Sequence, residues 1–157
     1  MTDKKKTHWG MTGTRAGATP RQEDTVYQML SRMRPDWLHH GCAVGADRQI
    51  HKIAKGLGIK VHGYPVGPTD PEVLGQLDAL SPSGDPLLRN HWIVDATSIL
   101  IAIPRTHQEE QRSGTWATIR YARRKGHIIL FVWPDGEFET HHYTKATADQ
   151  HIPEEEA

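Results

Sequence analysis

The sequence predicts a single α/β domain built on a doubly wound parallel sheet of about five strands. Its length of 157 residues suits one domain. Candidate strands alternate with single candidate helices, an order that gives right-handed crossovers between parallel strands. The apolar run at residues 128–133 is typical of a strand that is covered on both faces.

Each predicted element has its own signals. A short strand at residues 7–12 leads into a glycine-rich turn at 13–17. Thr19 as N-cap, Pro20 at the first helical position and Gln22 as the partner of a capping box predict a helix that starts at Pro20. The remaining predicted elements are a strand at 37–40, a helix ending before Gly58, a strand at 59–64, a helix at 87–96, a strand at 98–103, a helix at 113–125 and the strand at 128–133.

Three segments lie outside this regular pattern. Residues 1–6 form a basic N-terminal segment expected to be flexible, the domain spans 7–133, and residues 134–157 form a polar C-terminal tail. Residues 65–86 contain five of the ten prolines and cannot be regular throughout, although residues 72–80 have room for a helical turn or two. Loops this long in a compact domain are usually functional or disordered.

Composition excludes several classes of protein. Lys plus Arg and Asp plus Glu both number 19, so no net field attracts the chain to nucleic acid, and nucleic-acid binding is not expected. No stretch approaches the roughly 18 apolar residues of a membrane span, and the first residues lack the apolar core of a signal peptide. We therefore expect a cytoplasmic protein without membrane contact. The single cysteine, Cys42, excludes an internal disulfide and a multi-cysteine zinc site, and no metal site is expected.

The ligand site is expected beyond the carboxyl ends of the strands, where strand order reverses. Three turns are predicted to lie at this position, at residues 13–17, 41–47 and 104–115. Their small residues precede helices, whose free N–H groups and dipoles favour phosphate or carboxylate. The residues expected to bind a ligand are Gly13, Thr14, Arg15, Gly41, Cys42, Gly45, Ala46, Asp47, Arg89, Asn90, Pro104, Arg105, Ser113, Gly114 and Thr115.

Some of these residues have more than one interpretation. Asp47 either caps its helix or contacts a ribose hydroxyl or a partner loop, and the first turn is either an anion site or a plain tight turn with a surface arginine. Cys42 is expected to pack as a small residue, because no base or resolving cysteine accompanies it. Glu109 and Glu110 are candidate general bases, or charged residues of an exposed loop. The first turn does not have the G-x-G-x-x-G pattern of ordinary NAD binding.

Four segments in one order carry a family resemblance: Gly13-Thr14-Arg15, then residues 40–47 (HGCAVGAD), residues 89–94 (RNHWIV) and Ser113-Gly114-Thr115. Over residues 7–133 the sequence resembles the SLOG superfamily of Rossmann-like proteins, in particular its small YspA/YpsA-related branch. The resemblance implies a Rossmann-like pocket for a nucleotide or a nucleotide derivative. It also implies kinship with the LOG phosphoribohydrolases, which release cytokinin bases from their 5′-monophosphates, and with DprA-type proteins, which bind single-stranded DNA.

The LOG enzymes use an arginine before the fourth strand and a glutamate in a P-G-G-x-G-T-x-x-E loop. Arg89 occupies the position of that arginine, but Thr118 occupies the position of the glutamate and cannot act as a carboxylate. The resemblance thus favours a binding protein or sensor for a nucleotide or an ADP-ribose-like ligand, with no certain cofactor. The alternative is an N-glycosidase acting on nucleoside 5′-monophosphates, with Arg89 as candidate catalytic residue and a carboxylate from Asp47, Glu109 or Glu110. Family resemblance and the tryptophan content favour a homodimer or a larger homo-oligomer.

Overall fold

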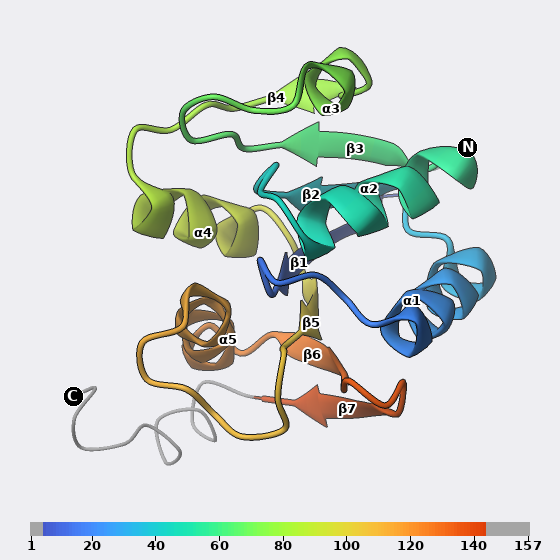
Figure 1. The fold of residues 1–157 in the computed structure, drawn as a ribbon, viewed down its shortest axis with the longest axis vertical. Helices are drawn as coiled ribbons and strands as arrows, with labels where there is room; N and C mark the ends of the chain where they lie inside the picture. Colours follow the sequence, from blue (N-terminus) through green and yellow to red (C-terminus); the bar gives the residue numbers. More distant parts are fainter. Residues whose placement is uncertain (1–4, 144–157) are drawn as a thin grey trace.

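The computed structural model describes residues 5–143, and the outer parts of the expected terminal segments, 1–4 and 144–157, lie outside the described residues. The chain forms one seven-stranded sheet between two layers of helices (Figure 1). The strands are β1 (His8–Gly13), β2 (Trp37–His40), β3 (Lys60–Gly63), β4 (Ala79–Leu80), β5 (Ile99–Ile103), β6 (Ile128–Val132) and β7 (Phe138–His142). The helices are α1 (Pro20–Met33), α2 (Ala46–Gly56), α3 (Pro71–Gly75), α4 (Pro86–Asp95) and α5 (Gly114–Arg124).

The strand order is β4-β3-β2-β1-β5-β6-β7, and every neighbouring pair is parallel except β6 with β7. The prediction of an α/β, doubly wound sheet is confirmed, but the expected number of about five strands is too small. The two additional strands lie at the edges. β4 has only two residues within the proline-rich segment 65–86, and β7 is a polar strand that returns antiparallel in the segment expected as a tail.

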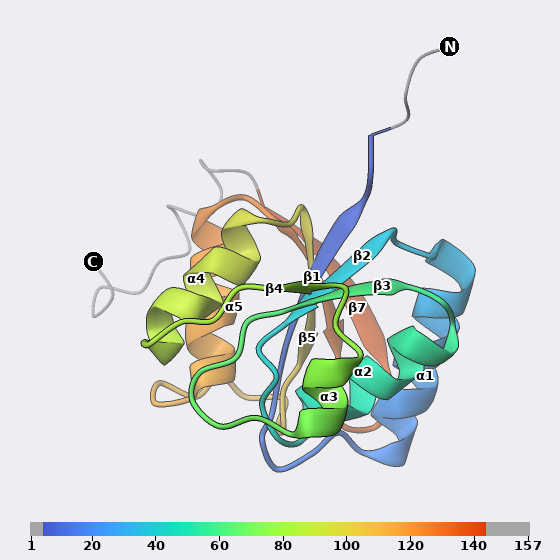
Figure 2. The same ribbon diagram turned by 90° about the horizontal axis from the view of Figure 1, so that it is seen from above.

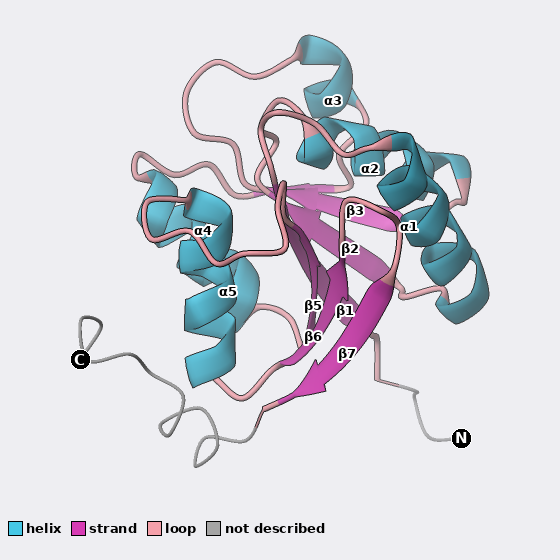
Figure 3. Ribbon diagram, turned by 60° about the horizontal axis from the view of Figure 1, so that its bottom comes forward, coloured by secondary structure: helices cyan, strands magenta, loops and turns pink. Residues whose placement is uncertain are grey.

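Helices cover both faces of the sheet. Helices α1 and α2 lie on one face and α4 and α5 on the other (Figures 2 and 3). Each layer buries its own apolar cluster, one including Met11, Leu30 and Ile50 and the other including Leu100, Ile119 and Phe131. The prediction for residues 128–133 holds, because β6 lies between β5 and β7 and its last four residues are buried.

Local signals explain where α1 begins. Thr19 Oγ1 accepts a hydrogen bond from the Gln22 amide, and Gln22 Oε1 accepts one from the Thr19 amide, which completes the predicted capping box. The Gln22 side-chain amide also donates to the backbone oxygens of Pro104 and Val132, both at 2.9 Å. The cap therefore joins the start of α1 to the carboxyl ends of β5 and β6. Across residues 5–143, no helix has the length and apolar character needed to cross a membrane.

Candidate functional site

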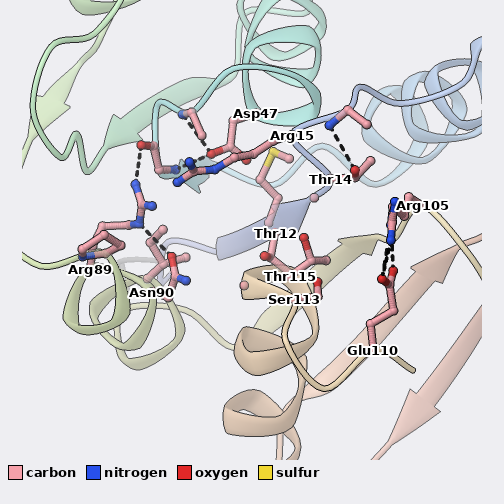
Figure 4. A pocket seen from close by; sticks show the side chains of 18 of the residues that line it. Thr12, Thr14, Arg15, Asp47, Arg89, Asn90, Arg105, Glu110, Ser113 and Thr115 are labelled. Atoms are coloured by element: carbon pink, nitrogen blue, oxygen red, sulfur yellow. Dashed lines mark hydrogen bonds and ion pairs between the residues drawn. The ribbon is translucent and has the colours of Figure 1, made fainter. Parts of the chain in front are cut away.

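A cavity of about 490 Å³ opens at the carboxyl ends of β1, β2 and β5, on both sides of the point where strand order reverses (Figure 4). This is the place expected from the sheet topology. The lining includes eleven of the fifteen residues expected to bind a ligand: Gly13, Thr14, Arg15, Gly41, Asp47, Arg89, Asn90, Arg105, Ser113, Gly114 and Thr115.

The small residues of the first two turns pack against each other. A Cβ on Gly13 would lie 2.5 Å from the Cβ of Ala46, and a Cβ on Gly45 would lie 2.5 Å from the carbonyl oxygen of Arg15. The Ala46 amide donates to the Thr14 carbonyl at 3.0 Å. Gly45 and Ala46, expected to approach a ligand, instead let the two turns approach each other, and neither lines the cavity.

Arg89 is a buried cation that lines the cavity. Its Nη1 donates to the carbonyl oxygen of Gly41 at 2.6 Å and to that of Tyr64 at 3.1 Å, while Nε donates to Asn90 Oδ1 at 2.7 Å. Burial lowers the pKa of Arg89 and the Asp47 carboxylate raises it. The guanidinium fits here because residue 41 is a glycine: a Cβ on Gly41 would lie 2.5 Å from Nη1 of Arg89. Among the described residues, Nη2 makes no hydrogen bond.

Asp47 caps the turn that precedes it. Its Oδ2 accepts from the amides of Gly41 at 3.1 Å and Ala43 at 3.2 Å. Burial raises the pKa of this carboxyl to about 6, although the two amides and Arg89 favour its ionised form. Asp47 therefore does not cap its own helix, since the N-cap of α2 is Gly45 and no side chain bonds to it; its carboxylate instead holds the preceding 41–43 turn.

The third wall is the loop between β5 and α5. Arg105 and Glu110 form a bidentate ion pair, with Nη2 of the arginine 2.7 Å from Oε2 of the glutamate. The hydrogen bond from Arg105 lowers the pKa of Glu110. Ser113 Oγ accepts from the Trp116 amide at 3.2 Å and caps α5, while Thr115 lies in the first turn of that helix and lines the cavity.

The cavity has a positive electrostatic character. It is lined by four arginines and only two carboxylates, and each carboxylate is already engaged, Asp47 by backbone amides and Glu110 by Arg105. The first turns of α2, α4 and α5 all contribute lining residues, at Asp47, Pro86 and Gly114. Helix N-termini carry partial positive charge, so the arrangement suits an anion.

A second cavity of about 370 Å³ adjoins the first and shares Arg15, Gly41 and Arg89 with it. Its own walls include the valines Val44, Val66 and Val73. Cys42 faces this second cavity rather than the first.

Cys42 and Pro104 complete the set of expected residues outside the first cavity. Burial raises the pKa of the Cys42 thiol to about 12, which keeps it protonated and unreactive at neutral pH. Pro104 is buried and uses its carbonyl oxygen to hold Gln22. Neither residue lines the first cavity.

The candidate carboxylates of the alternative hydrolase have other partners. Thr118, at the position of the family glutamate, is buried and donates its hydroxyl to the Gly114 carbonyl at 2.9 Å, so it does not face the cavity. Glu109 forms ion pairs with Arg120 at 3.1 Å and Arg123 at 3.7 Å. Of these candidates only Asp47 and Glu110 line the cavity.

Sequence reasoning missed several lining residues. Arg112 and Glu110 sit in a charged loop that resembles ordinary solvated surface. Ile93 follows Arg89 by one helical turn, so the helical spacing could have predicted that both line the same cavity. The lining residues outside the three predicted turns are Met11, Thr12, Pro86 and Ile93. Ala16, Ala43, Glu110 and Arg112 lie within those turns but were not predicted to bind the ligand, although Glu110 was a candidate general base.

The fold, rather than the sequence, connects this chain to known proteins. No protein-family model matches the sequence, and a search of curated proteins finds no match. Several solved structures are similar in fold, among them three with TM-scores of 0.63 or 0.64. DNA processing protein A from Streptococcus pneumoniae superposes with a TM-score of 0.64 at 18% identity over 80% of this chain and 50% of its own, so this chain spans half of that protein.

The other two structures are a molybdenum cofactor carrier protein from Chlamydomonas reinhardtii and a molybdenum cofactor binding protein from Rippkaea orientalis. Both have TM-scores of 0.63 at 19% identity. The first match covers 81% of this chain and 76% of the carrier protein, and the second covers 82% of this chain and 77% of the binding protein. These likenesses show that the chain shares the Rossmann-like fold of these proteins.

Proposed function

We propose that the cavity binds a phosphorylated, nucleotide-derived ligand, such as a nucleoside phosphate or an ADP-ribose-like molecule, and that the protein acts as a binding protein or sensor. The observation that carries this proposal is the charge of the lining. Four arginines and three helix N-termini surround one cavity whose two carboxylates already have partners. Such a site favours phosphate, whose oxygens accept bidentate hydrogen bonds from arginine.

The two adjoining cavities suggest how an extended ligand is divided. The phosphate groups lie in the first cavity, near Arg15, Nη2 of Arg89 and the start of α5. The base lies in the second cavity, against Val44, Val66 and Val73. Together the volumes of about 490 Å³ and 370 Å³ exceed what a lone phosphate requires, and pockets for small ligands measure roughly 300–1,000 Å³. Two similar structures are described as carrying or binding the molybdenum cofactor, which supports use of this fold for a small ligand.

Isothermal titration with AMP, ADP-ribose and ribose 5-phosphate tests the proposal. Arg15 lines both cavities, is exposed and makes no hydrogen bond through its side chain among the described residues, so its removal spares the fold. We expect Arg15→Ala to weaken binding by about tenfold, the loss of one charge-assisted hydrogen bond. Arg21→Ala, an exposed arginine on α1 outside the cavity, is the matched control and should bind like the wild type.

Two results would overturn this assignment. One is affinity for none of the three compounds by the folded protein, and the other is equal affinity in the wild type and Arg15→Ala. A labelled oligonucleotide added in the same titrations addresses nucleic acid, since the fold is shared with a DNA processing protein. The balanced net charge leads us to expect no competition between oligonucleotide and AMP.

Release of a base from nucleoside 5′-monophosphates is the second candidate function. Asp47 favours it, because a buried carboxyl with a pKa near 6 in a cavity can transfer protons at neutral pH. Against it, both candidate carboxylates of the cavity are engaged and Thr118 replaces the family glutamate. We expect chromatography to detect no free base from adenosine, guanosine, cytidine or uridine 5′-monophosphate. Steady release that Asp47→Asn abolishes, with nucleotide affinity retained, would instead establish the hydrolase.

A further inference from the structure

The strand β7 forms one edge of the sheet, and its outer side is unpaired among the described residues. Natural edge strands are commonly protected by lysine or proline, or by a covering helix. The five residues of β7, Phe138-Glu139-Thr140-His141-His142, include neither lysine nor proline. In Figures 1 and 3 the strand lies at the border of the molecule, with no helix beyond it. Within residues 5–143, nothing therefore pairs with this edge.

The hairpin that precedes β7 sets which backbone groups face outward. The Trp133 amide donates to the Glu137 carbonyl and the Gly136 amide to the Trp133 carbonyl, both at 2.8 Å, so Trp133 and Glu137 form a hydrogen-bonded pair. Hydrogen-bonded and non-hydrogen-bonded pairs alternate along an antiparallel ladder. With Leu130 opposite Thr140, the alternation directs the N–H and C=O groups of Phe138, Thr140 and His142 to the free edge.

The two faces of β7 differ in chemistry. Phe138, Thr140 and His142 line an apolar groove of about 690 Å³ against α1, where Phe138 is 56% exposed and Met33 58%. On the other face, the carboxylate of Glu139 lies 2.9 Å from Nε2 of His141. The strand thus combines unpaired backbone groups, an apolar groove and an acceptor–donor pair two residues apart.

We propose that β7 pairs antiparallel with β7 of a second copy of this chain, about a twofold axis at Thr140. The polar side chains select this register. With the axis at Thr140, Glu139 lies opposite His141 of the second copy at a non-hydrogen-bonded position, where Cα atoms are about 4.5 Å apart. An axis at Glu139 would place two carboxylates opposite each other, and like charges directly opposite are destabilising. An axis at His141 would place two imidazoles opposite each other and would leave no carboxylate opposite an imidazole.

This pairing buries the outward backbone groups of β7 and part of its apolar groove. Three hydrogen-bonded positions form, with Thr140 opposite its own copy and Phe138 opposite His142 of the second copy on each side. On the groove face, these aromatic pairs join the two apolar grooves into one surface across the axis. Every contact occurs twice, as expected for an isologous dimer. The occupant of this edge is therefore the same chain, and fourteen strands form one continuous sheet across the dimer, seven from each copy.

Disulfide trapping of the full chain tests the axis. In Thr140→Cys, the two new thiols fall at a hydrogen-bonded pair with Cα atoms about 5.5 Å apart, within the range that a disulfide spans. In the matched variant Phe138→Cys the two thiols lie four residue rises apart, about 14 Å, and cannot join. Cys42 contributes little background because burial raises the pKa of its thiol to about 12. We expect a covalent dimer from Thr140→Cys only, and equal cross-linking of both variants would overturn the register.

Sedimentation velocity over a concentration series tests the side-chain pairing. Glu139→His places imidazoles opposite each other and should weaken dimerisation several-fold, whereas the exchange Glu139→His with His141→Glu restores the complementary pairs and should restore the dimer. Glu137→His, in the turn before β7, is the control for loss of a nearby carboxylate and should dimerise normally. Circular dichroism verifies that each variant is folded. A wild-type chain that remains a monomer, or a dimer insensitive to Glu139→His, would overturn the proposal.

Discussion

Two walls of the same cavity are built by different physical means. The wall formed by the turns after β1 and β2 is held by backbone contacts, with the Gly45 Cα against the Arg15 carbonyl and the Ala46 amide bonded to the Thr14 carbonyl. The wall formed by the loop after β5 is held by ion pairs between side chains, the exposed Arg105 with Glu110 and Glu109 with the buried Arg120. One wall has no room to adjust, and the other consists of contacts that water and salt weaken.

The difference shows where rigidity and adaptability lie in this site. Packed backbone tolerates almost no added volume, whereas exposed ion pairs contribute about 0–1 kcal/mol each. We therefore expect changes in the packed backbone of the first wall to alter folding and changes in the ion pairs of the second wall to alter ligand affinity. Three experiments test that division, beginning with the largest expected effect.

The largest effect is expected at Gly45. Its φ of 84° is unfavourable for other residues, and an added Cβ would lie 2.5 Å from the Arg15 carbonyl oxygen and 2.6 Å from that of Thr14. Gly67 is a matched control, since its φ of 71° is also positive but nothing lies within 4 Å of an added Cβ. Chemical denaturation should show a loss of about 1–2 kcal/mol for Gly67→Ala from backbone strain alone, and a loss at least twice as large for Gly45→Ala. Equal losses would show that the two turns can separate freely.

Acid is the second test of the first wall. Burial, aided by the neighbouring His51, lowers the pKa of His40 to about 3, and the neutral imidazole accepts a hydrogen bond from the Cys42 amide through Nδ1. Burial likewise lowers the pKa of His39 to about 3. From the ordinary histidine pKa of 6.5 down to about 3, the unfolded chain binds protons that the folded chain does not. The free energy of unfolding should therefore fall as the pH decreases through this window.

Asp47 acts in the opposite direction within the same wall. Its pKa of about 6 in the fold exceeds the ordinary 3.8, so the folded chain binds the extra proton between these values and gains stability on acidification. The pKa shifts of the two histidines are larger than that of the one carboxyl, so the net effect of acidification is a loss of stability. Denaturation curves at pH 7 and pH 5 measure it, and Asp47→Asn should make the loss steeper. A protein equally stable at both values, in the wild type and in Asp47→Asn, would contradict the assignment.

The smallest effect on folding is expected in the second wall. In Glu110→Gln, Arg105 loses its bidentate partner, a pair in which the arginine side chain is 62% exposed. We expect the thermal midpoint to change little, since such pairs contribute little to stability. The affinity for a phosphorylated ligand should rise a few-fold, because Arg105 no longer has a competing carboxylate. That gain should shrink with added salt in calorimetric titrations, whereas a large fall in midpoint would mean that this loop is also part of the rigid framework.

Much of the fold could be predicted from local signals. The capping box at Thr19 and Gln22 forms as predicted, and the apolar run of β6 lies in the interior of the sheet. The strand β7 was missed because its residues are polar, although Asp135-Gly136 before it is a hairpin signal and Gly136 has a φ of 87°. The two-residue β4 has too few residues to show a pattern.

The position of the candidate cavity could be predicted, but not the details of its lining. Topology alone predicted a site at the carboxyl ends of the strands, where the cavity lies, and Arg89 was named from the family resemblance. A small residue, however, permits close approach either by a ligand or by another part of the chain, and the sequence does not distinguish these two uses. Gly41 leaves room for the Arg89 guanidinium, and Gly45 for the Thr14–Arg15 backbone. Likewise, Glu110 faces the cavity because of a pairing with Arg105 that only the folded loop creates.

The central place of β1 has a consequence for how the protein is made. This strand is the first to leave the ribosome, yet one of its two partners is β5, with Trp9 beside Ile99 some ninety residues later. Until that stretch has been synthesised, β1 has at most one neighbour, β2, and exposes an apolar edge. Such distant pairing slows folding and lengthens the time in which chains can aggregate. We therefore expect the nascent chain to need chaperone protection until β5 emerges, and soluble yield to depend on translation speed up to residue 103.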